Sequence, residues 1–463
     1  MGNHTSWGCA WLAGFSWFAA CSDGGDGNAD AFVAPDASVA PDASVAPDAF
    51  AAPDAFAAPD AFATSDGSTI HDGGAWSDGG GSASVLPPLA CTGATLTRMP
   101  VPSEYVANMG QLGSLVPPDH TFPTPHFYFY TKNPNDPSDI EAPVYAPGNL
   151  RLTGVTVRHY DKLRGGTPNY IDYSLTFNVC DDVDIYFHHV RSIVFPKLKA
   201  WIDARQSACS WAGDGGTNTG GGSNEQPCNL EPPREVIALA AGDQLGTAGD
   251  IRGVGGLDMG MRDWRLTTGR DYVNADRHCK GARGVFARCY AVCPLDYIDA
   301  VERAKYLNLF STMGKPVEST NKCGTVYWDV ANTAQGYWFP TDPKYPSYSE
   351  EYVLFMAPSP AKPSAEVFSM GRAVPDLNGQ RYAFTPKLSG LTNRRFADLK
   401  DNQIYCFDDL HSNEFDMTAQ NALPYVIVTQ LVSSATFKVE KQTRASCGTG
   451  PFAFAGKEAS FTR

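Results

Sequence analysis

The segment between residues 240 and 263 constrains the fold more than any other part of the chain. Its first half carries Gly242, Gly246 and Gly249, a spacing expected where a chain turns tightly between two strands and needs positive φ angles. Its second half alternates apolar with polar or small residues from Leu257 to Arg262, which is the period of a half-buried strand. The segment therefore predicts a turn followed by a β-strand.

Further runs with strand composition or alternation precede and follow this segment. Those before it are residues 127–130, 150–157, 173–179 and 183–190, the last two meeting at a turn. Beyond Cys323, six more runs are separated by turns: 336–339, 352–356, 382–384, 404–407, 425–428 and 435–439. Together with 44 Gly and 34 Pro, they predict a mainly β protein whose last part is a small barrel or sandwich.

Two short helices are also expected. Residues 195–204 form the first, and the second opens where Asp296 can cap a segment with one apolar face running to Leu307.

The order of several motifs resembles a known family. The strand at 127–130, the Pro143-Val144 segment, the His189-Val190 strand end and the glycine-rich turn follow one another as in the LytM/lysostaphin-like zinc peptidases, family M23. The resemblance covers residues 120–265 and implies the family's duplicated hybrid motif, an M23-like β-sheet or barrel-sandwich domain.

The same resemblance implies roles for individual residues, and it shows a broken catalytic signature. His126 matches the first zinc ligand, His189 matches a proton-handling histidine, and Asp258 stands at the last ligand position. Tyr130 stands where the family has a ligand Asp, and Gly256 where it has the second proton-handling histidine. A working site of this kind needs its metal ligands and both histidines. We therefore expect no hydrolysis and no cofactor.

A rearranged metal site is the alternative. His126 and Asp258 are competent zinc ligands, and His120 lies close in sequence, so these three residues with His189 as the catalytic group would make a zinc metalloendopeptidase-like hydrolase. Because consecutive side chains of a strand point to opposite faces, only one of His188 and His189 is expected to face the cleft.

The cysteines predict an oxidising compartment. Ten of the twelve lie beyond Cys21, and an even number spread over loops favours disulfides, with Cys209–Cys228 and Cys406–Cys447 as the preferred pairs. A zinc cluster around Cys289 is the alternative.

The first 89 residues predict an export segment and a spacer. Residues 1–21 are apolar and end in Phe-Ala-Ala-Cys21, which resembles the lipobox of bacterial lipoproteins. No Lys or Arg precedes that run, so an ordinary signal peptide or a mis-assigned start codon stays open. Residues 22–89 contain a six-residue Pro/Asp repeat and then a Gly/Ser/Asp stretch, which favour a disordered spacer.

Charge excludes one class of partner. Eleven Asp lie between residues 22 and 90, so the rest of the chain holds 36 basic and 39 acidic residues and shows no basic footprint for nucleic acid.

The sequence thus predicts four parts: a signal peptide with lipobox-like Cys21 (1–21), a spacer (22–89), a degenerate M23-like domain (90–320) and a β-rich C-terminal domain (321–463). We expect an exported bacterial envelope protein on the outer surface or in the periplasm, held to the membrane by a lipid anchor. Its M23-like domain would bind or scaffold peptidoglycan or a surface protein. A third interpretation is a glycan-binding adhesion module, which exposed aromatics at Trp328, Tyr337 and Trp338 would favour.

Overall fold

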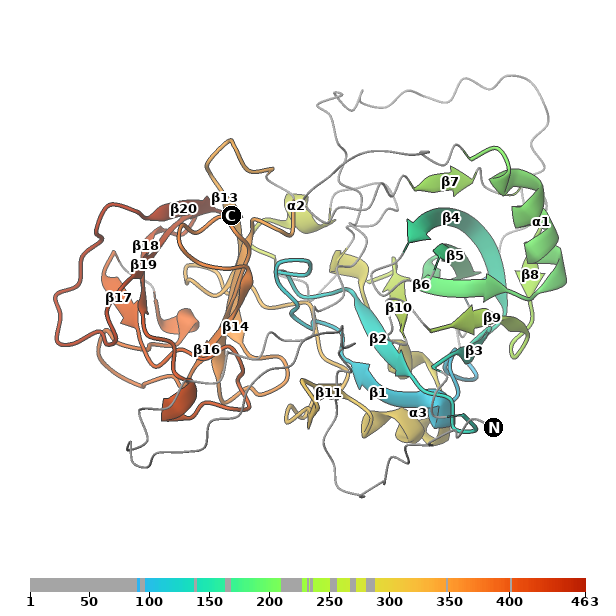
Figure 1. The fold of residues 1–463 in the computed structure, drawn as a ribbon, viewed down its shortest axis with the longest axis horizontal. Coiled ribbons are helices and arrows are strands. Elements are labelled where there is room, and N and C mark those ends of the chain that lie inside the picture. Colours follow the sequence, from blue (N-terminus) through green and yellow to red (C-terminus); the bar gives the residue numbers. More distant parts are fainter. Residues whose placement is uncertain are drawn as a thin grey trace, which may run out of the picture. The chain divides into compact units, whose positions relative to one another are not determined.

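A computed structural model describes residues 90–91, 96–136, 140–162, 168–209, 227–230, 233, 236–249, 256–266, 272–279, 288–346, 349–399 and 402–463. All of them belong to one compact unit, Asp54–Arg463. The predicted signal segment with Cys21 and the predicted spacer lie outside the described residues. The described chain is mainly β, as the sequence predicts (Figure 1).

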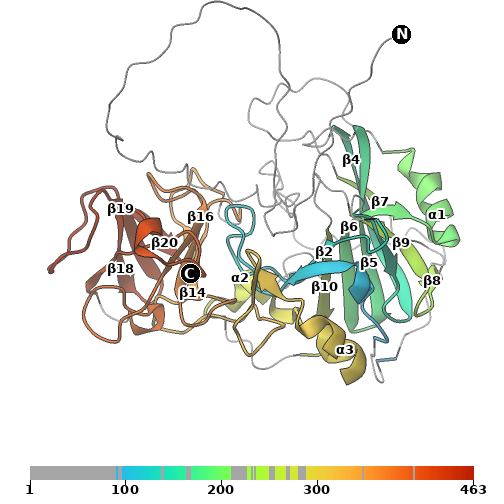
Figure 2. The ribbon, with the colours of Figure 1, turned by 60° about the horizontal axis from the view of Figure 1, so that its bottom comes forward.

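A ten-stranded antiparallel sheet forms the first half of the fold (Figure 2). Its main path runs through β1 (Val106–Gly110), β2 (His126–Thr131), β10 (Leu257–Asp263), β6 (Val183–Ile193), β5 (Pro168–Cys180), β4 (Leu150–Lys162) and β7 (Cys228–Leu230). Off this path, β3 (Ala142–Tyr145) pairs with β9 (Gln244–Ala248), β9 also pairs with β6, and β8 (Ala238–Leu239) pairs with β4.

The glycine-rich segment forms a turn and two strands. Gly242 and Gly249 have φ angles of 90° and 124°, as the predicted turn requires. Gly246 instead lies within β9, where a Cβ atom would come within 1.9 Å of the Ser192 carbonyl oxygen, so it allows a close approach of β9 to β6. The strand that follows is β10, but all seven of its residues are buried. The prediction of a half-buried strand was therefore wrong, because its polar face is covered as well.

One face of the central strands β2, β10 and β6 belongs to the hydrophobic core. The side chains on this face are Phe127, Phe129, Ile185, Phe187, Leu257, Met259 and Met261, all fully buried. Burying one such side chain stabilises the fold by about 1.5–3 kcal/mol. Because side chains alternate along a strand, the opposite face carries the polar side chains of the candidate site.

The second sheet has eight strands and is nearly closed into a barrel. Its order is β16 (Gln380–Phe384), β15 (Glu366–Met370), β14 (Leu354–Pro358), β13 (Gly336–Pro340), β20 (Ala459–Thr462), β19 (Thr436–Gln442), β18 (Val426–Ser433) and β17 (Ile404–Phe407). Buried aromatic side chains fill its interior, among them Trp338, Phe368, Phe384, Phe396, Phe407 and Phe437. The sequence predicted six of these strands and missed β15 and β20.

Short elements complete the described chain. The helices are α1 (Pro196–Gln206), α2 (Ala275–Cys279), α3 (Ala300–Leu307) and the 3-10 helices η1 (Ser103–Tyr105), η2 (Arg288–Tyr290), η3 (Pro294–Tyr297), η4 (Phe396–Asp398) and η5 (Ala419–Asn421). Strands β11 (Ser311–Thr312) and β12 (Lys315–Pro316) form a hairpin. The helix expected from Asp296 begins later, because Asp299 accepts hydrogen bonds from the backbone N–H groups of Val301 and Glu302 and caps α3. None of the described helices is long and apolar enough to cross a membrane.

Five disulfides link the described cysteines: Cys91–Cys180, Cys209–Cys228, Cys279–Cys289, Cys293–Cys323 and Cys406–Cys447. They include both pairs preferred from the sequence. Cys289 is bonded to Cys279, so these residues do not form the alternative zinc cluster. So many disulfides indicate an oxidising, extracytoplasmic environment.

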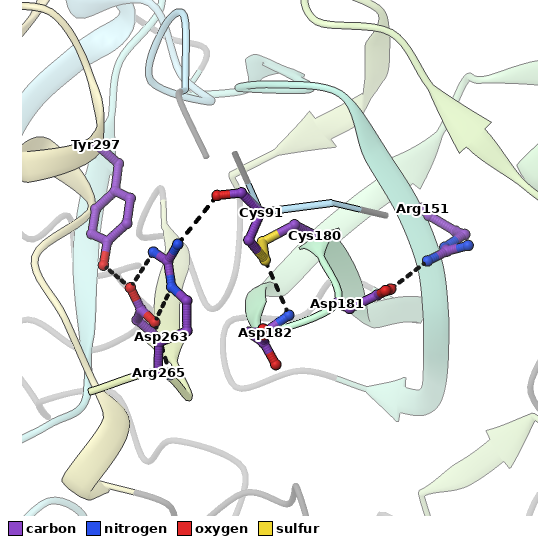
Figure 3. The surroundings of a disulfide bond; sticks show 8 residues. All are labelled: Cys91, Arg151, Cys180, Asp181, Asp182, Asp263, Arg265 and Tyr297. Carbon is purple, nitrogen blue, oxygen red and sulfur yellow. Dashed lines mark hydrogen bonds and ion pairs between the residues drawn. A yellow bond between two sulfur atoms is a disulfide. The ribbon is translucent and has the colours of Figure 1, made fainter. Parts of the chain in front are cut away.

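The Cys91–Cys180 disulfide fixes the start of the described chain to the end of β5 (Figure 3). The Arg265 guanidinium donates to the Cys91 carbonyl at 3.3 Å and to Asp263, the last residue of β10, at 2.6 Å. The Tyr297 hydroxyl donates to the same carboxylate at 2.6 Å. Covalent and polar contacts therefore hold this segment against two strands of the first sheet.

Candidate functional site

The polar face of the first sheet is built by three adjacent strands. The pairing of β2 with β10 and of β10 with β6 places His126, Tyr128, Tyr130, Asp258, Gly260, Arg262, Asp184, Tyr186 and His188 on this face. The candidate residues His126 and Asp258 are thus brought together from segments more than 130 positions apart in sequence, as the register of β2 and β10 requires.

Two histidines converge on one carboxylate oxygen. The Oδ2 atom of Asp258 lies 3.4 Å from Nε2 of His126 and 3.5 Å from Nε2 of His189. The other ring nitrogen of His189, Nδ1, lies 3.0 Å from Oδ2 of Asp172 on β5. All four side chains are buried. The result is a buried chain of contacts that runs from β2 through β10 and β6 to β5.

An unusual backbone conformation turns His189 toward this cluster. Its φ angle is 66°, a left-handed value that is uncommon for a residue other than glycine. On β6, His188 and His189 together stand opposite the single residue Ser174 of β5. This arrangement, two residues against one, is a β-bulge. The rings of His188 and His189 lie 6.4 Å apart, and the His188 ring lies 6.3 Å from that of His126. The prediction that only one of the pair faces the cleft was therefore wrong, because the bulge breaks the alternation.

The electrostatics of the cluster differ between its histidines. Burial opposes the charged form of His189, but the carboxylates of Asp172 and Asp258 outweigh it and raise the pKa of His189 to about 10. Burial would likewise raise the pKa of Asp172, yet the neighbouring His189 lowers it. Burial lowers the pKa of His126 to about 3, although Asp258 acts in the opposite direction. At neutral pH, His189 is therefore the charged partner of the two carboxylates, and His126 is neutral.

His120 lies next to His126, as the sequence suggested. Their ring centroids are 5.5 Å apart, and burial lowers the pKa of His120 to about 3. The Nε2 atom of His120 is buried without a hydrogen-bond partner, and Nε2 of His126 makes only the 3.4 Å contact with Asp258, which is not a hydrogen bond. Such atoms are costly in a folded protein and mark a place where a ligand or water would find a partner.

The two positions at which the chain departs from the M23 pattern offer neither a carboxylate nor an imidazole. Tyr130 stacks on Tyr128 with ring centroids 6.4 Å apart, and burial together with the nearby Asp258 raises the pKa of Tyr130 to about 12. Gly256 is buried just before β10 and has no side chain.

Further residues of this face could not be identified from the sequence. Tyr186 lies across Gly260, where a Cβ atom would come within 2.0 Å of the tyrosine Cζ. Arg262 donates to Asp184 at 2.7 Å, and Asp184 also accepts from the indole N–H of Trp264 at 2.7 Å. Asp172, the partner of His189, also went unnoticed. It lies in a strand that carries several other polar residues, so no pattern in the sequence distinguishes it.

The sequence also left open a rearranged metal site built from His126, Asp258 and His120. Across the part of the chain that the structure describes, no group of three or more His, Cys, Asp or Glu side chains is arranged to hold a metal ion. Of the set expected from the sequence, His126 approaches Asp258, whereas His120 meets the His126 ring edge to face.

Comparisons with known proteins found no relative of this chain. No family model matches the chain, and neither a curated protein nor a solved structure matches it. The M23 resemblance thus stays a prediction from the motifs.

The aromatic residues that would have favoured glycan adhesion are mainly core residues. Tyr337 and Trp338 are buried in β13, and the Tyr337 hydroxyl donates to the Val326 carbonyl at 2.5 Å. Trp328 is half-buried and donates to the Thr325 carbonyl. These three side chains therefore give no support to the adhesion interpretation.

Proposed function

We propose that this protein is an exported envelope lipoprotein whose M23-like domain binds peptidoglycan or a protein partner without cleaving it. The observation that carries the proposal is the contact of His126 and His189 with one oxygen of Asp258. The groups that a peptidase would direct at its substrate are directed at one another.

The chemistry of hydrolysis explains why this arrangement favours binding. A general base must have a free ring nitrogen within reach of the attacking water. Both ring nitrogens of His189 face carboxylates, Asp172 at 3.0 Å and Asp258 at 3.5 Å. With Gly256 in place of a second proton-handling histidine, the site also lacks a group that stabilises the developing oxyanion. Losing one such group typically slows a reaction about 10²- to 10³-fold.

The location in the envelope belongs to the same proposal. The disulfides support an oxidising compartment. Lipidation at Cys21 and the Pro/Asp spacer would hold the folded part away from a bacterial membrane, on the outer surface or in the periplasm. The proposal requires neither zinc nor any other cofactor.

The test uses the purified full-length protein and insoluble peptidoglycan. Co-sedimentation measures binding, and mass spectrometry of the supernatant measures released peptides with and without added zinc. We expect binding without release. An Asp258→Asn variant should bind more weakly because it disturbs the buried contacts, whereas Asp203→Asn on the exposed side of α1 serves as the matched control.

Cleavage would overturn the proposal. If peptides are released, and if His126→Ala, His189→Ala or Asp258→Ala abolishes their release, the cluster is a rearranged zinc site and the protein is a hydrolase.

A further inference from the structure

The loop between β1 and β2 carries His120 and leads directly into His126. It closes on itself, since the backbone N–H of Val116 donates to the carbonyl of His120 and the reverse bond has the same length, 2.8 Å. The N–H of Gly113 donates to the Thr124 carbonyl at 2.8 Å. These bonds shape the loop, but most of its second half is held by residues that lie further along the chain.

Two residues of the C-terminal barrel hold this second half. The Ser369 hydroxyl, on β15, donates to the Thr121 carbonyl at 2.6 Å, and both residues are fully buried. The carboxylate of Glu350, just before β14, accepts from the backbone N–H of Phe122 at 2.7 Å. Hydrogen bonds to a charged acceptor are among the stronger ones in proteins.

Arg288 connects these contacts to the first sheet. Its guanidinium pairs with Glu350, and its Nε donates to the Pro123 carbonyl at 3.3 Å. The two charged side chains are only 11% and 15% exposed. The Phe122 ring packs on Tyr337 and Phe339 of β13, with ring centroids 4.9 and 5.2 Å away.

Each residue from 121 to 125 consequently has a main-chain group held by a defined partner. The last of them is the Pro125 carbonyl, which accepts from the Tyr186 hydroxyl at 3.0 Å. Buried main-chain polar groups need such partners, and a loop in which consecutive groups all have one is fixed in position.

We propose that the C-terminal barrel is part of the candidate site, with Glu350 and Ser369 as positioning residues. They fix the loop of residues 116–125 and so hold the His120 ring beside His126. What the site binds rests on the proposed function, but the positioning itself does not. The barrel therefore contributes directly to the site and is not a functionally independent domain.

The physical consequence is specific to these residues. Without the Glu350 carboxylate, the Phe122 N–H loses its acceptor and the buried Arg288 loses its counter-charge. A buried donor left without a partner is unfavourable, so the loop should open to water and the His120 ring should leave its place.

The experiment uses the full-length protein with ¹³C-labelled histidine. The signals of His120 and His126, assigned by His→Gln replacement, report ring positions, and hydrogen exchange reports the loop backbone. In Glu350→Ala both signals should shift, and the Phe122 amide should exchange roughly 10- to 100-fold faster.

Two further variants and a control separate positioning from general destabilisation. Glu350→Gln keeps an oxygen acceptor for Phe122, so it should restore most of the histidine signals, and Ser369→Ala should loosen residues 121–123. Glu351→Gln is the matched control, because Glu351 pairs with Arg372 on the exposed surface and should leave the site unchanged.

The binding measurement tests the proposed function and is interpreted separately from the histidine and exchange data. If the wild type binds peptidoglycan, Glu350→Ala should bind it at least about tenfold more weakly. If the wild type does not bind, the proposed function fails while the histidine and exchange data still decide the positioning. Unchanged histidine signals and unchanged exchange in folded Ser369→Ala protein, with Glu350→Ala also unchanged or unfolded, would overturn the inference.

Discussion

Acidification should unfold this protein at an unusually mild pH, because four histidines, two of them buried and two half-buried, stay neutral in the folded chain. Burial lowers the pKa of His120, His126, His188 and His278 from 6.5 to about 3. In the unfolded chain each takes up a proton as the pH falls through 6.5, whereas the folded chain takes it up only near pH 3. The unfolded state therefore binds more protons in this window, and the free energy of unfolding falls with the pH.

Two other groups determine how steeply the free energy of unfolding changes with pH and at which pH it is greatest. Burial raises the pKa of Glu366 from 4.5 to about 7, so between these values the folded state binds one proton more than the unfolded state. That offsets one histidine and leaves a difference of about three protons, or at most about 4 kcal/mol per pH unit between pH 6 and 5. The pKa of His189, raised to about 10, gives stability that is complete below pH 6.5 and is lost as the pH rises through 10. Stability should thus be greatest near pH 6.5.

Urea unfolding followed by tryptophan fluorescence at several pH values between 5 and 8 measures this slope. His278→Phe is the informative variant, because His278 stacks on Tyr272 at 4.4 Å, outside the candidate site, and a phenyl ring can fill the same place. It should reduce the slope by about 1 kcal/mol per pH unit. The reasoning would be refuted if the free energy of unfolding stayed constant or increased from pH 6 to 5. It would also be refuted if the His278→Phe protein had the wild-type slope.

Three further changes have defined outcomes. Gly260→Ala places a Cβ atom within 2.0 Å of Tyr186 and should cost about 1–3 kcal/mol in urea unfolding, and a neutral effect would show that the ring moves freely. Arg463→Ala removes the guanidinium 3.8 Å from the buried Asp329 and should cost about 3–5 kcal/mol, and a loss below about 1 kcal/mol would contradict the pairing. Limited proteolysis, read by mass spectrometry, should trim residues 22–89 and leave a resistant core that begins near Cys91, whereas a protected Pro/Asp repeat would contradict the spacer prediction.

The sequence predicted the strands that show alternation or a continuous apolar or aromatic run, and it missed strands that show neither. Strand β10 was found because apolar residues alternate from Leu257 to Met261. Strand β15 was missed because all five of its residues are buried, including Glu366, so neither alternation nor an apolar run shows in Glu-Val-Phe-Ser-Met. The buried carboxylate receives the Phe396 N–H at 3.4 Å, a partner that only the folded barrel supplies.

The candidate site shows the same limit at the level of one residue. The motif order identified His126, His189 and Asp258, and the contact of His126 with Asp258 follows from the strand register. It could not place both His188 and His189 on one face, because that depends on a left-handed backbone at His189. A non-glycine residue held in this region costs on the order of 1–3 kcal/mol and persists only where surrounding contacts determine it. Here those contacts are the carboxylates of Asp172 and Asp258, on either side of one imidazole ring. A histidine that only filled space in the core would need neither the bulge nor the two carboxylates, so the cost of this arrangement is itself an argument that the site has a function.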